Sequence, residues 1–177
     1  MSNTFDYSNN CAEEVPVYGT ISAATVADKE EILALYRTML YGAADWSEDY
    51  PNEETIDFDI SRASLFAMRN EAGEIISVIS IDQDEEVEAL DCWDRALAPG
   101  GELSRLCVRK DMHNHGIAKE MMKYAFEELK RRGKKSVHIL VKTGHVVAFA
   151  SYSKLGFKRV GECNLFGKDF VCMELEF

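Results

Sequence analysis

The chain has 177 residues, 46% of them hydrophobic and 29% charged, and its formal net charge is −11. This length suits one domain, which can bury about 70% of its unfolded surface, and the composition excludes a disordered protein. The acidity argues against a nucleic-acid partner, and no apolar run reaches the roughly 18 residues that a membrane span needs. We therefore expect a cytoplasmic globular protein without nucleic-acid or membrane partners, with residues 1–19 as an N-terminal extension and residues 20–177 as one domain.

Charge is distributed unevenly. Residues 1–108 contain 6 Lys and Arg against 23 Asp and Glu, whereas residues 109–135 contain 9 against 4. The basic stretch is either a solvated helix face or, through Arg109, Lys110 and Lys119, a region that attracts a polyanionic ligand. The acidic remainder suits a cationic amine as a second ligand.

The cysteines predict neither a metal site nor a disulfide framework. Their spacing matches no zinc motif, and their number is odd. A hairpin turning at Gly167-Lys168 would put Cys163 opposite Cys172, but a reducing cytosol favours free thiols. The five are Cys11, Cys92, Cys107, Cys163 and Cys172.

The first elements are a strand and a helix. Residues 20–26 are β-prone, and Asp28 followed by Glu31 reads as a capping box for a helix over residues 29–41, which Gly42 ends. Residues 43–61 form an acidic loop in which Trp46 and Tyr50 either pack down or hold a protonated amine by cation–π contacts.

The middle of the chain predicts a hairpin and two loops. Residues 64–68 and 74–81 are strand-like around a turn at residues 70–73. The charge run at 82–88 is a solvated loop or an electrostatic guide for a cationic substrate, and a second loop at residues 91–101 contains Pro and Gly.

The stretch from Glu102 to Gly133 predicts an anion site. Residues 103–108 are an apolar-rich strand, and apolar residues at helical spacing from Ile117 to Leu129 indicate an amphipathic helix that Gly133 stops. Between them lies the loop 113–118, whose small residues Gly116 and Ala118 open the helix. The unpaired N–H groups of a first helical turn favour a phosphate there.

Three further elements complete the sheet. Residues 136–141 read as a buried strand, and a helix begins at Thr143 or His145 with His145, Ala148 and Tyr152 on one face. Residues 159–165 and 169–175 form a closing hairpin. The order of elements predicts an α/β protein of the α+β kind, with a mixed sheet flanked by helices.

Two motifs stand out by their letters: residues 113–118 read His-Asn-His-Gly-Ile-Ala, and residues 152–157 read Tyr-Ser-Lys-Leu-Gly-Phe. They resemble two motifs of the GNAT superfamily of acyl-CoA-dependent N-acyltransferases. The family loop is Gln or Arg, two variable residues, Gly, one variable residue, and Gly or Ala, which residues 113–118 fit except that His113 stands first. The second family motif is Tyr-x-Lys-x-Gly-Phe, which residues 152–157 fit. The resemblance implies a GNAT-like, largely antiparallel central sheet in a single domain.

The resemblance also implies a site for acetyl-CoA as co-substrate, without a metal. The pantetheine arm would pair with the backbone of Leu106, Cys107 and Val108. The pyrophosphate would meet the N–H groups that follow His113, and His145 replaces the family's usual Asn beside the small Ala148. The N–H groups belong to Asn114, His115, Gly116, Ile117 and Ala118.

The resemblance makes Tyr152 the general acid that protonates the departing thiolate, and the sheet position of Glu102 makes it our candidate base. Strand alternation puts Glu102 on one face with Ser104, Leu106 and Val108. The expected function is N-acetyl transfer to a primary amine of a small molecule. A protein or peptide amine and a non-catalytic acyl-CoA-binding module are the alternatives, and the oligomeric state stays open, a homodimer included.

Overall fold

The computed structural model describes residues 18–177. Cys11 and all but the last two residues of the expected N-terminal extension, 1–19, lie outside the described residues. Seven strands form one sheet in the order β1-β2-β3-β4-β5-β7-β6, and every pairing except β4 with β5 is antiparallel. This confirms the expected α+β architecture. The strands are β1 (Thr20–Ala23), β2 (Leu65–Arg69), β3 (Ile75–Asp82), β4 (Gly100–Val108), β5 (Ser136–Lys142), β6 (Lys158–Leu165) and β7 (Lys168–Glu176).

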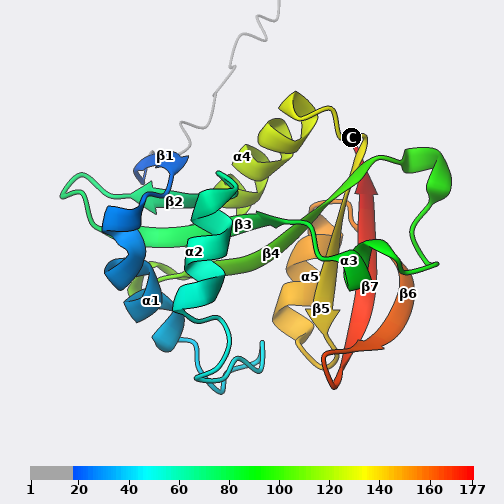
Figure 1. Ribbon diagram of the computed structural model, residues 1–177, viewed down its shortest axis with the longest axis horizontal. Coiled ribbons are helices and arrows are strands. Elements are labelled where there is room, and N and C mark those ends of the chain that lie inside the picture. Colours follow the sequence, from blue (N-terminus) through cyan, green and yellow to red (C-terminus); the bar gives the residue numbers. More distant parts are fainter. Residues whose placement is uncertain (1–17) are drawn as a thin grey trace, which may run out of the picture.

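Helices cover both faces of the sheet, as Figure 1 shows. No helix in the described part of the chain has the length and apolar character needed to cross a membrane. The α-helices are α1 (Lys29–Arg37), α2 (Glu53–Ser61), α3 (Glu85–Glu88), α4 (Ile117–Arg131) and α5 (Val146–Lys154), and the short 3-10 turns are η1 (Val26–Asp28), η2 (Arg95–Leu97) and η3 (Lys110–Met112).

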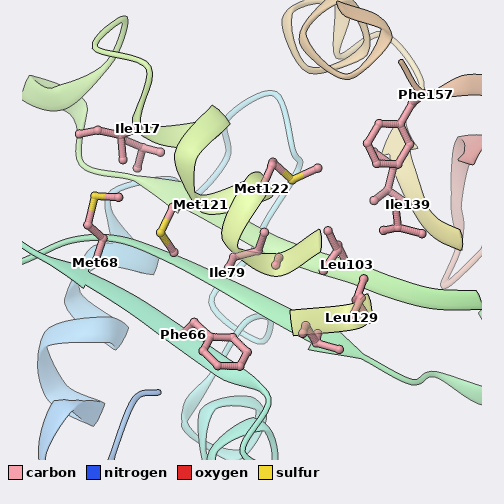
Figure 2. Packing of buried hydrophobic residues seen from close by; sticks show 14 of the residues in the cluster. Phe66, Met68, Ile79, Leu103, Ile117, Met121, Met122, Leu129, Ile139 and Phe157 are labelled. Carbon is pink, nitrogen blue, oxygen red and sulfur yellow. The ribbon is translucent and has the colours of Figure 1, made fainter. Parts of the chain in front are cut away.

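Helix α4 packs on one face along the stripe that its sequence predicts. Met121, Met122 and Leu129 are fully or almost fully buried, and Figure 2 shows them against Ile79 of β3 and Leu103 of β4. Burying each such side chain contributes about 1.5–3 kcal/mol, so this face anchors the loop that precedes the helix.

The opposite face is covered by α1 and α2, and here two predictions were wrong. Residues 53–61 are helical instead of part of a loop: the Asn52 side chain caps α2 by accepting from the N–H of Thr55 (3.0 Å), and Ile56 is fully buried. The capping pair before α1 is Thr25 with Asp28, because Glu31 instead accepts a hydrogen bond from the N–H of Ile75 (2.6 Å).

The closing hairpin turns one residue earlier than expected. Leu165 pairs with Lys168, so the turn is Phe166-Gly167, and a bulge before Gly161 brings that residue opposite Cys172. Cys163 therefore pairs with Phe170 and not with Cys172. The four described cysteines, Cys92, Cys107, Cys163 and Cys172, are free thiols.

Candidate active site

The sheet opens between β4 and β5. These parallel strands pair only at Gly100, Gly101 and Glu102 among the described residues, and Figure 1 shows them separating beyond this point. The rest of β4 thus has backbone N–H and C=O groups on this edge without a partner strand, and such groups can pair with an extended ligand.

A cavity of about 630 Å³ occupies the opening. It is bounded by β4 and β5, by α5, by the segment after α1 and by the β6–β7 turn. Among its lining residues are Trp46, Tyr50, Asp82, Asp84, Glu102, Ser104, Arg105, Leu106, His145, Ala148, Tyr152, Phe166 and Lys168.

Glu102 is a buried carboxyl group at the point where the strands part. It is 5% exposed, and its Oε2 accepts a hydrogen bond from the N–H of Asp84 at 3.1 Å. Burial, reinforced by the neighbouring Asp82 carboxylate, raises the pKa of Glu102 to about 8. The ionised form, which predominates above about pH 8, is more basic than an ordinary carboxylate and can take a proton from an amine.

Arg105 interrupts β4 and was not identified from the sequence. Its φ of +51° and the register shift opposite β3 form a bulge, which bends the strand and breaks its alternation. Leu106 and Val108 therefore pack with the α4 side, as Leu103 does. The prediction that Leu106 and Val108 share a face of the sheet with Glu102 and Ser104 was therefore wrong.

The Arg105 side chain is held by carboxylates beneath the cavity. Its Nη2 lies 2.8 Å from the fully buried Asp59, and its Nη1 lies 2.6 Å from Asp82 and 2.8 Å from the hydroxyl of Tyr50. No sequence signal separates Asp59 and Asp82 from the surrounding solvated acids, because their burial follows from tertiary contacts.

The predicted face of α5 does line the cavity. His145 caps the helix, its Nδ1 accepting from the N–H of Ala148 at 3.4 Å, and burial lowers its pKa. Tyr152 reaches the same cavity and packs near Phe157, with 5.8 Å between ring centroids. Burial raises the pKa of Tyr152 to about 12, so its phenol keeps a proton to donate at neutral pH.

The loop before α4 has the geometry of an anion site. Asn114 and Gly116 both adopt positive φ, at 63° and 82°, and Gly116 is the N-cap of α4. The N–H groups of the first turn have no intrahelical acceptor and no capping side chain, and Ala118 in this turn is exposed. His113 does not point toward a ligand: its Nε2–H donates to the carbonyl oxygen of Val108 at 2.8 Å and fastens the loop to β4.

Of the remaining residues predicted to bind the cofactor, some line the cavity and others do not. His115 lies beside its own loop, with Nδ1 2.8 Å from the carbonyl of His113, and Ile117 is buried in the α4 core. Leu106 lines the cavity, whereas the thiol of Cys107 faces the other side of the sheet, 3.9 Å from the carbonyl of Leu35. Only the backbone of Cys107 is available to a ligand in the opening.

The basic residues near the loop are partly neutralised. Arg109 forms ion pairs with Glu74 (3.2 Å) and Asp111 (2.8 Å), whereas Lys110 and Lys119 are exposed. In residues 18–177, no three His, Cys, Asp or Glu side chains are grouped as metal ligands.

Trp46 and Tyr50 line the end of the cavity formed by the segment after α1, and none of residues 113–118 is among the lining residues. Trp46 packs edge-on against Tyr36, with 5.3 Å between ring centroids, and also lines the cavity, so the packing role is present and the expected contact with a protonated amine stays a prediction. The same end is bridged by Lys168, whose Nζ donates to the carbonyl of Asp45 and lies 3.3 Å from its carboxylate.

Comparisons with known proteins agree with this geometry. The model of the acetyltransferase (GNAT) family matches residues 29–157. No curated protein matches the chain. The ribosomal-protein-alanine N-acetyltransferase of Brucella melitensis has a similar structure, with a TM-score of 0.71 and 20% identity over 89% of this chain and 99% of that one.

Two solved structures with bound cofactor are also similar. A GNAT phosphinothricin acetyltransferase from Sinorhizobium meliloti, in complex with AcCoA, has a TM-score of 0.72 and 19% identity, covering 90% of this chain and 89% of that one. The PaiA N-acetyltransferase of Thermoplasma acidophilum, in complex with coenzyme A, has a TM-score of 0.67 and 20% identity, covering 89% and 98%. The family match over most of the chain, with the fold that these structures share, shows that the chain belongs to the GNAT family of acetyltransferases.

Proposed function

We propose that the protein transfers an acetyl group from acetyl-CoA to a primary amine of a small molecule. The observation that carries this proposal is that one cavity brings together a carboxyl group with a pKa of about 8, Glu102, and a protonated phenol, Tyr152. Acetyl transfer to an amine requires the removal of one proton and the delivery of another, and these two groups match the two tasks.

The residues present fit acetyl-CoA as the acetyl donor. The unpaired N–H groups at the start of α4 suit a pyrophosphate, and the unpaired edge of β4 at Leu106 to Val108 suits the amides of a pantetheine arm. His145 and Ala148 would flank the arm from α5. When bound, acetyl-CoA supplies the activated thioester.

Glu102 would act first in the transfer. A primary amine with a pKa near 10.4 is mostly protonated at neutral pH and cannot attack in that form. Ionised Glu102 would accept its proton directly or through water. As the new C–N bond forms and the C–S bond breaks, Tyr152 would donate its proton to the departing sulfur.

The contact between Lys168 and Asp45 favours a small acceptor. Lys168 is the first residue of β7 and binds Asp45 in the segment after α1, and residues of both segments line the cavity. Because this contact ties the two segments together, we expect it to hinder a polypeptide acceptor more than a small one. Trp46 and Tyr50, with the carboxylates of Asp82 and Asp84, provide contacts that suit a small organic cation.

A protein α-amine is the rival acceptor, because two similar structures are ribosomal-protein-alanine N-acetyltransferases. The test is acetyl-CoA-dependent thiol release with a panel of small amines and of short peptides that have a free α-amine. We expect the best small amine to have a higher kcat/KM than any peptide, and Lys168→Ala to raise peptide turnover. Lys123→Ala, which breaks a surface ion pair with Glu120, is the matched control.

Three outcomes would separate the alternatives. A peptide that exceeds every small amine in the wild-type protein would overturn the small-molecule assignment. Calorimetric binding of acetyl-CoA without thiol release from any acceptor would indicate a non-catalytic binding module. The absence of acetyl-CoA binding would contradict both.

A further inference from the structure

A second cavity, of about 210 Å³, lies beneath the segment that joins β3 to β4. None of the described residues lines both this cavity and the one that contains Glu102 and Tyr152. Its wall includes Glu88, Asp91, Trp93, Asp94, His138 and Glu174.

The His138 imidazole is held rigidly in this wall. The residue is 2% exposed, its Nε2 lies 2.9 Å from Oε1 of Glu88, and its ring stacks on Trp93 with 4.5 Å between centroids. A carboxylate can only accept, so Nε2 carries a hydrogen, and in the neutral ring Nδ1 is then a hydrogen-bond acceptor.

Nδ1 of His138 has no protein partner. A buried acceptor without a donor lowers the stability of the fold by about 1–3 kcal/mol, and most buried polar groups in proteins have a partner. The adjacent strand contributes Gly100, where a Cβ would lie 3.0 Å from Nδ1 and 2.9 Å from Oγ of Ser136. The chain thus places no side chain beside this nitrogen.

Ser136 does not supply the missing donor. Its Oγ lies 3.3 Å from the carbonyl oxygen of Leu97 and 3.3 Å from Oε1 of Glu174, and its single hydrogen is directed at those acceptors. The carboxylate of Glu174 is itself 5% exposed and accepts from the N–H of Asp94 at 3.0 Å. Neither of these two side chains therefore has a free hydrogen to donate to Nδ1 of His138.

The chemistry of the wall defines a ligand. Four carboxylates line the cavity, and Arg95, the one cationic side chain among its described lining residues, is 91% exposed and paired with the equally exposed Asp91. We propose that this cavity binds a small organic ammonium ion, which donates N–H hydrogens to Nδ1 of His138 and to Glu174 and places its alkyl part along Trp93. This site is separate from the acetyl-transfer cavity, and the proposal does not depend on the proposed function.

The chain allows a direct test, because Trp46 and Trp93 are its two tryptophans. In a Trp46→Phe variant, the emission of Trp93 reports on the second cavity alone. Titration with n-propylammonium is expected to give a saturable change in the millimolar range. Tetramethylammonium, which has charge but no N–H, should bind roughly tenfold more weakly, and 1-propanol should cause no saturable change.

His138→Phe in the same background keeps a ring beside Trp93 and removes Nδ1. It should weaken n-propylammonium binding roughly tenfold, whereas Glu127→Gln on the surface of α4 should leave it unchanged. No saturable change, an equal response to 1-propanol, or undiminished binding by folded His138→Phe would each overturn the proposal. If that variant does not fold, the Nδ1 ¹⁵N resonance of His138 in the wild-type protein decides: it should move on addition of n-propylammonium, and a fixed resonance would overturn the site.

Discussion

Glu102 on β4 and Asp82 on β3 lie directly opposite each other in the antiparallel ladder. Two carboxylates so placed repel each other when both are ionised, and Asp82 is kept ionised by Arg105, which holds its pKa below the usual value despite partial burial. Glu102 is more deeply buried, so the repulsion raises the pKa of Glu102. The pair thus divides into a permanent anion and a group that titrates near pH 8.

Removing the charge of Asp82 should move the titration of Glu102. In Asp82→Asn, the limb of kcat/KM that rises through about pH 8 should shift to lower pH by about one pH unit, because Arg105 then stabilises the Glu102 carboxylate without opposition. A pH profile of thiol release measures this. Glu85→Gln, a nearby exposed carboxylate on α3, serves as control, and a limb that stays in place in Asp82→Asn would show that the two groups are not coupled.

Tyr152→Phe should lower kcat about 100-fold and leave the Kd of acetyl-CoA unchanged. The substitution removes only the hydroxyl, and the ring keeps its packing near Phe157. Steady-state kinetics and calorimetry separate the two quantities. Tyr124→Phe, on α4 and outside the cavity, is the matched control; equal turnover in the two variants would remove Tyr152 as the acid.

The anion loop can be tested with two substitutions at one position. A Cβ at Gly116 would meet nothing within 4 Å, but its φ of +82° makes any side chain strained, so Gly116→Ala should cost about 1–2 kcal/mol of stability and little affinity for acetyl-CoA. Gly116→Glu adds a negative charge and should weaken binding roughly tenfold or more, less so at high salt. Calorimetry measures both, and equal affinities would count against a pyrophosphate at this loop.

The buried pair of Asp59 and Arg105 should be essential for stability. Asp59→Ala leaves the buried guanidinium of Arg105 with Asp82 as its remaining carboxylate partner. The free energy of unfolding should fall by about 3–5 kcal/mol. Asp57 lies on α2, as Asp59 does, and is a half-exposed partner of Lys29 on α1. Asp57→Ala should lower the free energy of unfolding by about 1 kcal/mol or less. Urea denaturation compares them; similar losses would mean that the buried pair contributes no more than a surface one.

Local patterns predicted the elements that their own periodicity determines. Helix α4 and the strands flanking it follow from apolar spacing, and the loop 113–118 follows from small residues at a helix start. The shared face of His145, Ala148 and Tyr152 follows from helical geometry alone. All three line the cavity for that reason.

Features that depend on tertiary contacts could not be predicted in this way. Helix α2 has few apolar residues, and the burial of Ile56 against α1 decides its conformation. The bulge at Arg105 requires a positive φ at a residue that rarely adopts one, and it reverses the facing of Leu106 and Val108. For the charge run at residues 82–88, the sequence left open a solvated loop and an electrostatic guide, and only tertiary contacts place Asp82 and Asp84 in the wall of the cavity.

The role of Glu102 as acceptor of the amine proton can be measured from kcat/KM against pH for the wild-type protein and for Glu102→Gln. Ionised Glu102 takes its proton from the ammonium form of the amine, so wild-type kcat/KM should rise with pH through about 8 and show no further rise near the pKa of the amine. Glu102→Gln should be about 100-fold slower near pH 8 and should rise only near the pKa of the amine, where free amine becomes available. A rise near pH 8 that persists in Glu102→Gln would contradict the assignment.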